Sequence, residues 1–466
     1  MIEFPEAEPY RIKVVEHLKV TTREQRAKIM KDAQYNIFNI PAEDVFVDLL
    51  TDSGTSAMSQ DQWAGIMRGD ESYAGCRNWF HLQETIQDIT GYKYVIPTHQ
   101  GRPAENILML IHVKPGKAAL GNMFFDSTHA HVETKGGIPY DLIIDEGLES
   151  EGNYPFKGNI DIDKLEGRIE KEGVDNVALI HITVTCNNNG GQPVSMANLK
   201  AVREVADKYG LPFFLDAARF AENAFFIKMR EPGYQDKSVK EIAQEMFSYA
   251  DGCTMSSKKD GLVNMGGFLA LNDEDKYRQA QQYLILMEGF VTYGGMAGRD
   301  LEALAIGLKE VLDIAYLANR TRQVKLLGDQ LLEAGIPVVQ PIGGHCIMLD
   351  MKRFLPYIPQ EKFPSEAFAA ALYIDSGTRI IGLGQLAFGS EDAETGEINY
   401  SKLEFARFAI PRRVYTDNHM NVVARSVIRV FEQREKLNGL KITWAPSVLR
   451  HFTAHLEPIS DSPLFA

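Results

Sequence analysis

One stretch near the middle of the chain restricts the fold more than any other. Residues 177–185 (VALIHITVT) are short, apolar and β-branched, which is typical of a buried strand. A turn-rich segment follows, and residues 196–209 place apolar side chains three and four positions apart, as in an amphipathic helix. Residues 213–216 (FFLD) then predict a second buried strand that ends on Asp216. This strand–helix–strand order favours an α/β fold, because parallel strands need a long crossover connection.

The pattern continues on both sides of this unit. Residues 94–97 (YVIP) predict another strand, which runs into a polar turn and then a helix from about Pro103. The C-terminal third mixes short strands with helices that we expect near 402–407 and over 421–436. This change of pattern predicts a smaller second domain of the α+β type, and 466 residues suffice for two or three domains.

Composition excludes several classes of protein. The chain has 49 Lys and Arg against 63 Asp and Glu, a net charge of −14, which does not favour binding to nucleic acid or to an anionic membrane. No apolar stretch approaches the length of a membrane span, and the first residues do not resemble a secretory signal. The four cysteines are far apart and form no CxxC pair, which argues against a disulfide scaffold or a zinc ribbon. We therefore expect a cytoplasmic globular protein with neither nucleic acid nor membrane as a partner.

Two polar groups suggest a ligand site. Asp216 ends a strand, where open α/β sheets bind ligands, and Arg219 follows it. Position alone favours a structural ion pair, and the alternative is a carboxylate held for a protonated ring nitrogen. Ser256 and Lys259 have the Ser-x-x-Lys spacing of penicillin-recognising hydrolases, whose companion motifs are absent. Because Lys258 and Lys259 lie in a segment without helical pattern, we expect extended backbone and only one lysine in a pocket.

A third group would hold an anion. Gln100, Gly101 and Arg102 precede a helix, whose first N–H groups and dipole favour negative charge. Residues 382–384 (GLG) we interpret as a loop rather than a dinucleotide motif, and the histidines at 129 and 131 as incidental rather than a metal site. An anion cradle, a strand-end acid and a lysine together favour pyridoxal phosphate (PLP), which needs a partner for its phosphate, ring nitrogen and aldehyde.

From residue 9 to residue 454 the chain resembles the tryptophanase and tyrosine phenol-lyase family of β-eliminating lyases. The stretches that carry the resemblance are 48–55 (DLLTDSGT), 69–75 (GDESYAG), 97–102 (PTHQGR), 190–195 (GGQPVS) and 410–416 (IPRRVYT). The resemblance implies the PLP-dependent transferase fold (fold type I), with a mostly parallel central sheet in a large domain and a smaller α+β domain. It implies an N-terminal arm and part of the small domain at 1–57, a large PLP-binding domain at 58–310, and a linking helix with the C-terminal small domain at 311–466.

The resemblance also assigns roles around the cofactor. Lys259 would carry PLP as a Schiff base and act as the base at the α-carbon, helped by desolvation and by the neighbouring cation Lys258. Asp216 would pair with the pyridinium nitrogen, and Phe125 would stack on the ring. Arg219 and Asn187 would lie beside the phenolic oxygen. The phosphate would be surrounded by Gln100, Gly101, Arg102, Ser256 and Lys258.

Further residues would act on the substrate, which is a small molecule, an L-amino acid. Arg412 would bind its α-carboxylate as a bidentate fork, and Tyr73 would protonate the leaving group. Glu71, with the backbone carbonyls of Gly54 and Asn264, resembles the family's site for potassium or another monovalent cation. Tyr293 resembles a residue that is contributed across a subunit interface, so the resemblance predicts a homotetramer.

The leaving group separates the two branches of the family. Asp126 and His451 occupy positions where phenol-lyases carry a threonine and a phenylalanine, and Asp126 could accept the indole N–H. Leu383, two residues after Ile381, stands where phenol-lyases place an arginine against the phenolic oxygen. These positions favour the conversion of L-tryptophan to indole, pyruvate and ammonia.

Three departures point away from that reading. Pro103 replaces the usual glycine, Gly382 replaces a glutamate found in both branches, and the segment 111–122 is short, as in phenol-lyases. The alternatives are therefore a tyrosine phenol-lyase or a related lyase with another leaving group, such as the thiol of an S-substituted cysteine. From other classes, a non-catalytic PLP-binding homologue and an aminotransferase stay open.

Overall fold

The computed structural model describes residues 7–391, 398–446 and 449–466, which form two compact units. The large unit contains residues 7–9 and Ser53–Thr321, and the small unit contains Tyr10–Asp52 and Arg322–Ala466. The division at 57/58 and 310/311 stays a prediction, and the first six residues of the expected arm lie outside the described residues. No helix in the described part of the chain is both long and apolar enough to cross a membrane.

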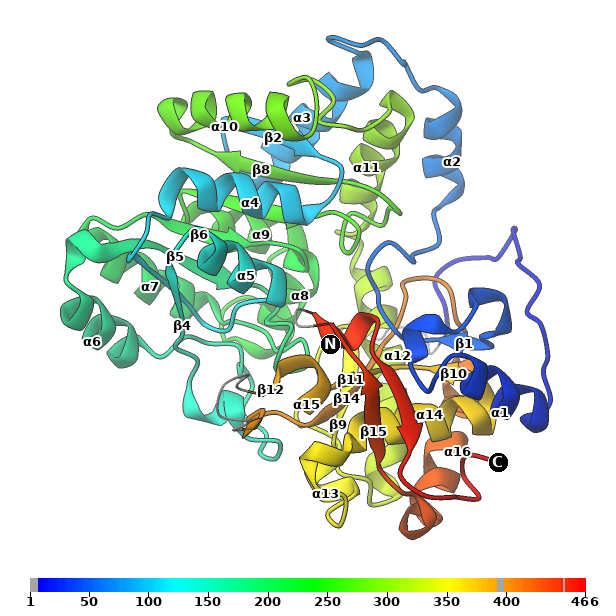
Figure 1. Cartoon of the computed structure of the whole chain (residues 1–466). Helices are drawn as coiled ribbons and strands as arrows, with labels where there is room; N and C mark the ends of the chain where they lie inside the picture. Colours follow the sequence, from blue (N-terminus) through cyan, green and yellow to red (C-terminus); the bar gives the residue numbers. More distant parts are fainter. Residues whose placement is uncertain (1–6, 392–397, 447–448) are drawn as a thin grey trace. The chain divides into compact units, whose positions relative to one another are not determined.

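A seven-stranded sheet forms the centre of the large unit, in the order β2-β8-β7-β6-β5-β3-β4 (Figure 1). Only β8 runs antiparallel to its neighbours, β2 and β7, and the other pairs are parallel. The predicted α/β fold with a mostly parallel sheet is confirmed. The strands are β2 (Tyr94–Thr98), β3 (Ala118–Gly121), β4 (Ile138–Asp141), β5 (Val177–Thr183), β6 (Phe213–Asp216), β7 (Gly252–Ser256) and β8 (Gly267–Leu271).

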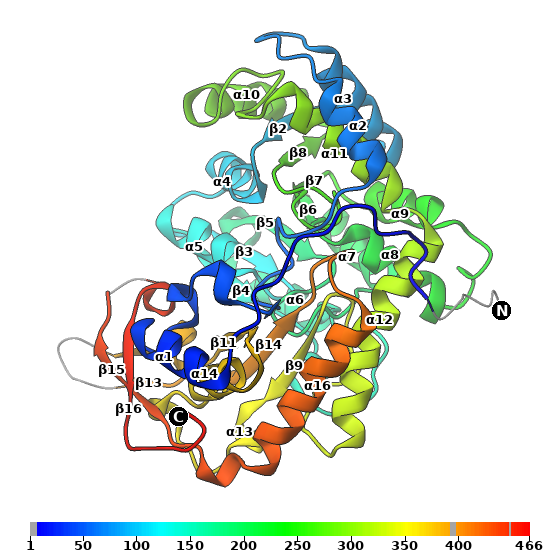
Figure 2. The ribbon, with the colours of Figure 1, turned by 90° about the vertical axis from the view of Figure 1, so that its right-hand side faces the viewer.

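Helices cover both faces of this sheet, with α4 and α5 on one face and α8 and α9 on the other (Figure 2). Neighbouring strand residues therefore enter different cores: Leu179 and Ile180, both fully buried, belong to separate hydrophobic clusters. The helices are α2 (Gln60–Met67), α3 (Arg77–Thr90), α4 (Gly101–His112), α5 (Asp126–Thr134), α6 (Ile162–Glu172), α7 (Met196–Tyr209), α8 (Phe220–Arg230), α9 (Val239–Ser248), α10 (Glu274–Met287) and α11 (Gly298–Glu310).

The small unit is built around a three-stranded antiparallel sheet in the order β11-β14-β9. Its strands are β9 (Cys346–Asp350), β11 (Ile381–Leu383) and β14 (Phe405–Ala409), and shorter pairs join β1 (Val47–Asp48) to β10 (Thr378–Arg379), β12 (Ser390–Glu391) to β13 (Ile398–Asn399), and β15 (Leu440–Trp444) to β16 (His455–Pro458). The helices are α1 (Arg23–Asp32), α13 (Met351–Phe354), α14 (Pro364–Ser376), α15 (Gln385–Phe388) and α16 (Asp417–Glu432), and the boundary between the units falls inside α12 (Ile314–Glu333).

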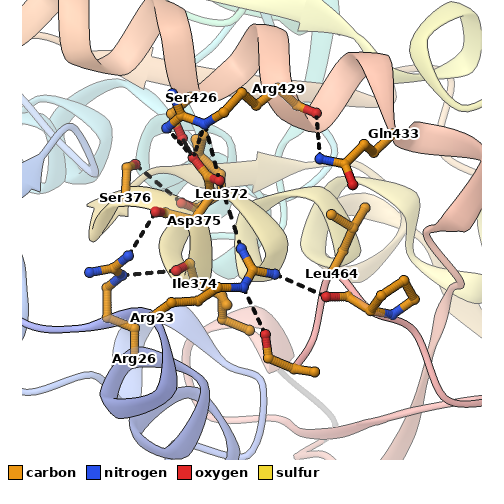
Figure 3. Close-up of polar contacts among 12 residues, drawn as sticks. Arg23, Arg26, Leu372, Ile374, Asp375, Ser376, Ser426, Arg429, Gln433 and Leu464 are labelled. Atoms are coloured by element: carbon orange, nitrogen blue, oxygen red, sulfur yellow. Dashed lines mark hydrogen bonds and ion pairs between the residues drawn. The ribbon is translucent and has the colours of Figure 1, made fainter.

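Polar contacts around Asp375 hold three helices of the small unit together (Figure 3). The carboxylate of Asp375, near the end of α14, accepts hydrogen bonds from Ser426 Oγ at 2.6 Å and from Arg429 Nη2 at 2.5 Å, both on α16. Arg26 of α1 donates to the backbone carbonyls of Ile374 and Asp375 at 2.8 and 2.7 Å. The early helix α1 is thereby tied to the C-terminal part of the chain.

Two predicted elements of the small unit are wrong. The helix expected near 402–407 is strand β14, because its side chains alternate between buried and partly exposed positions while its backbone pairs with β9 and β11. The loop expected at 382–384 includes strand β11, which pairs with β14. In both cases the strand depends on partners distant in sequence, which local pattern does not reveal.

Candidate active site

The strand-end acid of the large unit lies in a tight turn between β6 and α8. Asp216 is buried, and its Oδ1 accepts the backbone N–H of Ala218 at 3.0 Å. Arg219, also buried, donates its backbone N–H to Val184 O at 3.2 Å. Asp260 approaches from the lysine segment and accepts the N–H of Ala221 at 2.8 Å, at the start of α8. The turn after β6 and the segment after β7 therefore meet at one end of the sheet.

The two lysines lie in a turn after β7, so the expected extended backbone is wrong. The backbone N–H of Lys259 donates to Ser256 O at 3.3 Å and that of Leu262 to Lys259 O at 3.0 Å, which closes the turn. Lys259 Nζ donates to Ser256 Oγ at 2.9 Å, whereas the Lys258 side chain extends toward Gly54, where a Cβ would lie 2.6 Å from Lys258 Cε. The turn sends the two side chains to different partners, and that only one of them enters a pocket stays a prediction.

The anion cradle forms where α4 begins. A Cβ at Gly101 would lie 2.6 Å from Ser256 Cβ, so only glycine allows the helix start to approach β7 this closely. Burial lowers the pKa of Lys258, and so does the positive charge of Arg102. Because Arg102 acts on Lys258 in this way, the two cations lie near each other at the start of the helix. Pro103 lies in the first turn, where its missing N–H costs no helical hydrogen bond. This arrangement suits a dianionic group such as phosphate.

The donor set of the large unit fits PLP. It offers a cationic cradle for the phosphate, a buried carboxylate for the ring nitrogen and a lysine for the aldehyde, placed where strands β2, β6 and β7 end. Phe125 stands immediately before α5, and Asn187 lies in the loop after β5, where its Nδ2 donates to Asn188 Oδ1 at 2.9 Å. Asn188 also contacts Asp126 Oδ1 at 3.4 Å, which links Asp126 to the same loop.

Sequence reasoning missed Glu105, a buried carboxyl group on α4. Its Oε2 accepts a hydrogen bond from Ser127 Oγ of α5 at 2.7 Å. Burial and the charge of Asp216 raise its pKa to about 7, against the opposing effect of Lys259 and Arg102. The sequence signal that could have revealed Glu105 is its position as a single acid on the apolar face of α4, which it shares with Ala104 and Leu108.

In the small unit, Arg412 forms a buried ion pair. Its guanidinium is fully buried, and Nη1 lies 2.8 Å from Asp52 Oδ2. The backbone brings them together, because Ala409 N–H, at the end of β14, donates to Leu49 O, after β1, at 2.9 Å. A guanidinium has five N–H donors, so it can hold Asp52 and present further donors to a second carboxylate.

Two of the residues considered for contact with the leaving group belong to an apolar cluster of the small unit. Ile381 and Leu383 project from one face of β11 into a cluster against which Phe38 packs. The ring of Phe38 lies 6.1 Å from that of His451, edge to face. We call Phe38, Ile381, Leu383 and His451 the apolar wall. Phe38 was missed because it lies in an early 3-10 helix, Ile37–Asn39, far from the others in sequence.

The remaining predicted residues form exposed groups on the large unit. Tyr73, 71% exposed, contacts the rings of Phe290 and Tyr293, and its hydrogen bond with Tyr293 raises its pKa. The carboxylate of Glu71 accepts the backbone N–H of Gly298 at 2.8 Å, at the start of α11.

The two residues whose backbone carbonyls are assigned to the cation site lie close together on this unit. Asn264 Nδ2 donates to Gly54 O at 3.0 Å and to Ser56 O at 3.1 Å. Gly54 and Asn264 are thus brought together, and the Glu71 carboxylate accepts backbone N–H groups at the start of α11. Within the described residues, no three His, Cys, Asp or Glu side chains gather to hold a metal ion, and this includes the histidines at 129 and 131.

Comparison with known proteins gives a consistent result. Residues 48–426 match the family model described as beta-eliminating lyase. The chain is 54% identical over 456 residues to a tyrosine phenol-lyase of Symbiobacterium sp. (strain SC-1), which covers 98% of this chain and 99% of that protein. It is 53% identical to a tyrosine phenol-lyase of Clostridium tetani, over 97% and 98% of the two chains. It is 51% identical to a probable beta-eliminating lyase of Trichomonas vaginalis, over 98% and 99%.

Solved structures agree on the fold. A serine palmitoyltransferase variant from S. paucimobilis with bound PLP–myriocin superposes with a TM-score of 0.58 at 13% identity, covering 83% of this chain and 87% of that chain. The complex of SepCysS with the N-terminal domain of SepCysE gives 0.55 at 14% identity, over 84% and 96%. These likenesses confirm the expected type I fold.

Proposed function

The chain belongs to the β-eliminating lyase family, and on that basis we propose that it removes an aromatic ring from the β-carbon of an L-amino acid, with phenol from L-tyrosine as the first candidate. The enzyme is a PLP-dependent lyase whose substrate is a small molecule, an amino acid. What supports an aromatic leaving group is the apolar wall, in which the ring of Phe38 packs edge to face on His451 and against the cluster that contains Leu383. The names of the relatives favour phenol over the indole that Asp126 and His451 suggested.

PLP supplies an electron sink that stabilises negative charge at the α-carbon. The chain's own residues would do the rest. Lys259 would remove the α-proton, and its approach to Ser256 Oγ keeps its Nζ at the mouth of the anion cradle. Arg412, rigidly held by Asp52, would orient the substrate carboxylate. Tyr73 would donate a proton to the departing ring, since a phenol is protonated at neutral pH and can act as a general acid.

Two features of the large unit would support this proton movement. Glu105, with a pKa of about 7, exchanges a proton near neutral pH beside Asp216 and Lys259. Its bond to Ser127 would hold the start of α5, and with it Phe125 and Asp126, against the cofactor pocket.

Leu383 gives a second candidate for the leaving group. The side chain is apolar and 93% buried, and it offers no charge to a phenolic oxygen. A buried polar group without a partner is costly, so an apolar thiol from an S-substituted cysteine would suit this wall. Purified enzyme should be given L-tyrosine, L-tryptophan and S-benzyl-L-cysteine in turn while pyruvate is measured. We expect faster turnover of tyrosine than of tryptophan, and the reverse order would restore the indole assignment.

We also propose that activity requires a monovalent cation bound by Glu71 and the carbonyls of Gly54 and Asn264. Oxygen ligands suit potassium. A cation bound there would also order the loop that contains Gly54, which the Lys258 side chain approaches. Initial rates should be high in potassium or ammonium chloride and low in sodium chloride at matched ionic strength. Glu71→Gln should lower the rate in potassium and abolish the difference among salts. Equal rates of the wild type in all three salts would remove the cation site.

The assembly that we propose is a homotetramer in which neighbouring subunits share active sites. The exposed ring of Tyr73 packs on the half-buried rings of Phe290 and Tyr293, and an exposed aromatic surface is typical of an interaction site. Sedimentation velocity should give a tetramer, and a Tyr293→Ala variant should dissociate and lose activity together. A fully active monomer would contradict shared sites.

A further inference from the structure

Glu366 and Gly382 occupy one space in the core of the small unit. Glu366 lies in the first turn of α14, which packs against β11, and its side chain is buried. A Cβ on Gly382 would lie 2.6 Å from Glu366 Oε1 and 3.0 Å from its Cδ. The carboxyl group of Glu366 therefore stands where a side chain at position 382 would have to go. The family resemblance expects a glutamate at 382, and here a carboxyl group reaches the same place from the helix.

A second carboxyl group, that of Glu404, lies beside the first. Glu404 accepts hydrogen bonds from the hydroxyl of Ser365, from Gln385 N–H at 3.0 Å and from Gln360 Nε2 at 3.2 Å, so its anionic form is well satisfied. Glu366 Oε2 is buried and has no hydrogen-bond partner among the described residues. Burial raises the pKa of both carboxyl groups, so the two do not both ionise easily, and the one with fewer donors keeps the proton.

The charges that act on Glu366 support this assignment. Burial and the charge of Glu404 raise the pKa of Glu366 to about 8, while Arg450 of the 3-10 helix Arg450–Phe452 opposes them. Arg450 itself donates to the carbonyls of Gln385 and Leu386 at 2.6 and 2.9 Å. Of the two carboxyl groups, Glu366 is therefore the one that favours its neutral form.

The carboxyl group of Glu366 lies against strand β11, which carries two residues of the apolar wall. Successive residues of a strand face opposite sides of the sheet. Gly382 therefore faces Glu366, while Ile381 and Leu383 project from the other side as part of the apolar wall. We propose that Glu366 is a specificity-determining positioning residue: its carboxyl group, seated against Gly382, fixes β11 and thereby the position of Leu383 against the leaving group. The specificity part rests on the proposed function, whereas the packing part does not.

The packing is tested by a double-mutant cycle read out as melting temperature without substrate. Gly382→Ala should lower the melting temperature because its Cβ overlaps Glu366, and the loss should shrink in a Glu366→Ala background, where Ser365 Cβ, at 3.0 Å, is the remaining close atom. Gly167→Ala is the matched control, because a Cβ there meets nothing within 4 Å. Strictly additive shifts would overturn the proposal.

The positioning role is tested by discrimination between substrates. Glu366→Ala should change the ratio of kcat/KM for L-tyrosine over S-methyl-L-cysteine by about tenfold or more, since a moved wall acts on the large leaving group. Glu366→Gln, of the same shape, should stay closest to the wild-type ratio. If tyrosine is not a substrate, the ratio is taken between S-benzyl- and S-methyl-L-cysteine, so failure of the aromatic assignment is seen separately. An unchanged ratio in Glu366→Ala would overturn the positioning role.

The protonation of Glu366 has its own readout. A carboxyl group whose pKa is raised on folding costs stability as pH rises from its unfolded value, 4.5, to its folded value of about 8. Glu366→Gln removes that cost, so its melting temperature should match the wild type near pH 5 and exceed it at pH 9. A wild-type advantage at pH 9 would show that Glu366 is bound as an anion and would overturn the proposal.

Discussion

Lys259→Ala should lower pyruvate formation by about 10⁴-fold and abolish covalent attachment of the cofactor. Lys259 lies in the turn after β7, with its Nζ 2.9 Å from Ser256 Oγ, and is thus held beside the anion cradle. We assign it both the attachment of PLP and the removal of the α-proton, so one substitution removes two functions. Borohydride reduction followed by peptide mass spectrometry should find the label on Lys259 in the wild type and no labelled lysine in the variant.

The neighbouring lysine provides the control. Lys258 shares burial and charge with Lys259 but extends toward Gly54, and we place it at the phosphate. Lys258→Ala should weaken PLP binding while the label stays on Lys259. A reducible label that persists on another lysine in Lys259→Ala, with unchanged absorbance, would show that the attachment site is wrong.

Arg412→Gln should destabilise the protein by about 3–5 kcal/mol, because it leaves the carboxylate of Asp52 buried without its cation. The Arg412 side chain is 0% exposed and that of Asp52 3%, so water cannot replace the lost partner. Chemical denaturation measures this loss of unfolding free energy. Turnover should also fall, since the substrate carboxylate loses its fork of N–H donors.

The two effects can be separated by a double variant. Asp52→Asn together with Arg412→Gln leaves two neutral amides that can bond to each other, so most of the stability should return. Activity should not return, because carboxylate binding needs the guanidinium. If the double variant regained both stability and a wild-type KM, Arg412 would be structural and the substrate carboxylate would bind elsewhere.

The sequence predicted the fold best where the signal is local. The strand and helix expected at 177–185 and 196–209 correspond to β5 and α7, because β-branched runs and helical spacing are properties of adjacent residues. The strand β14 was missed because its pairing with β9 and β11 joins segments far apart in the chain. Local pattern does not contain that information.

The same limit applies to the site. The strand-end acid and the anion cradle could be proposed from the sequence because each occupies a recognisable strand-to-helix connection, and the lysine because it follows a buried strand in the connection from β7 to β8. Phe38 and Glu366 could not, since each gains its role from a partner in a distant segment: His451 for Phe38, and Gly382 for Glu366. The sequence marks Gly382 as the loss of a carboxylate, and in the structure the carboxyl group of Glu366, from α14, lies against that glycine.

The central claim is that the chain eliminates a β-substituent, and product stoichiometry tests it most directly. Purified holoenzyme is incubated with L-tyrosine and with S-benzyl-L-cysteine, and pyruvate, ammonia and the released phenol or thiol are quantified together. The account predicts that the three products form in equal amounts from at least one of these substrates. Conversion of either substrate to a keto acid that retains its side chain, or consumption of neither, would contradict it.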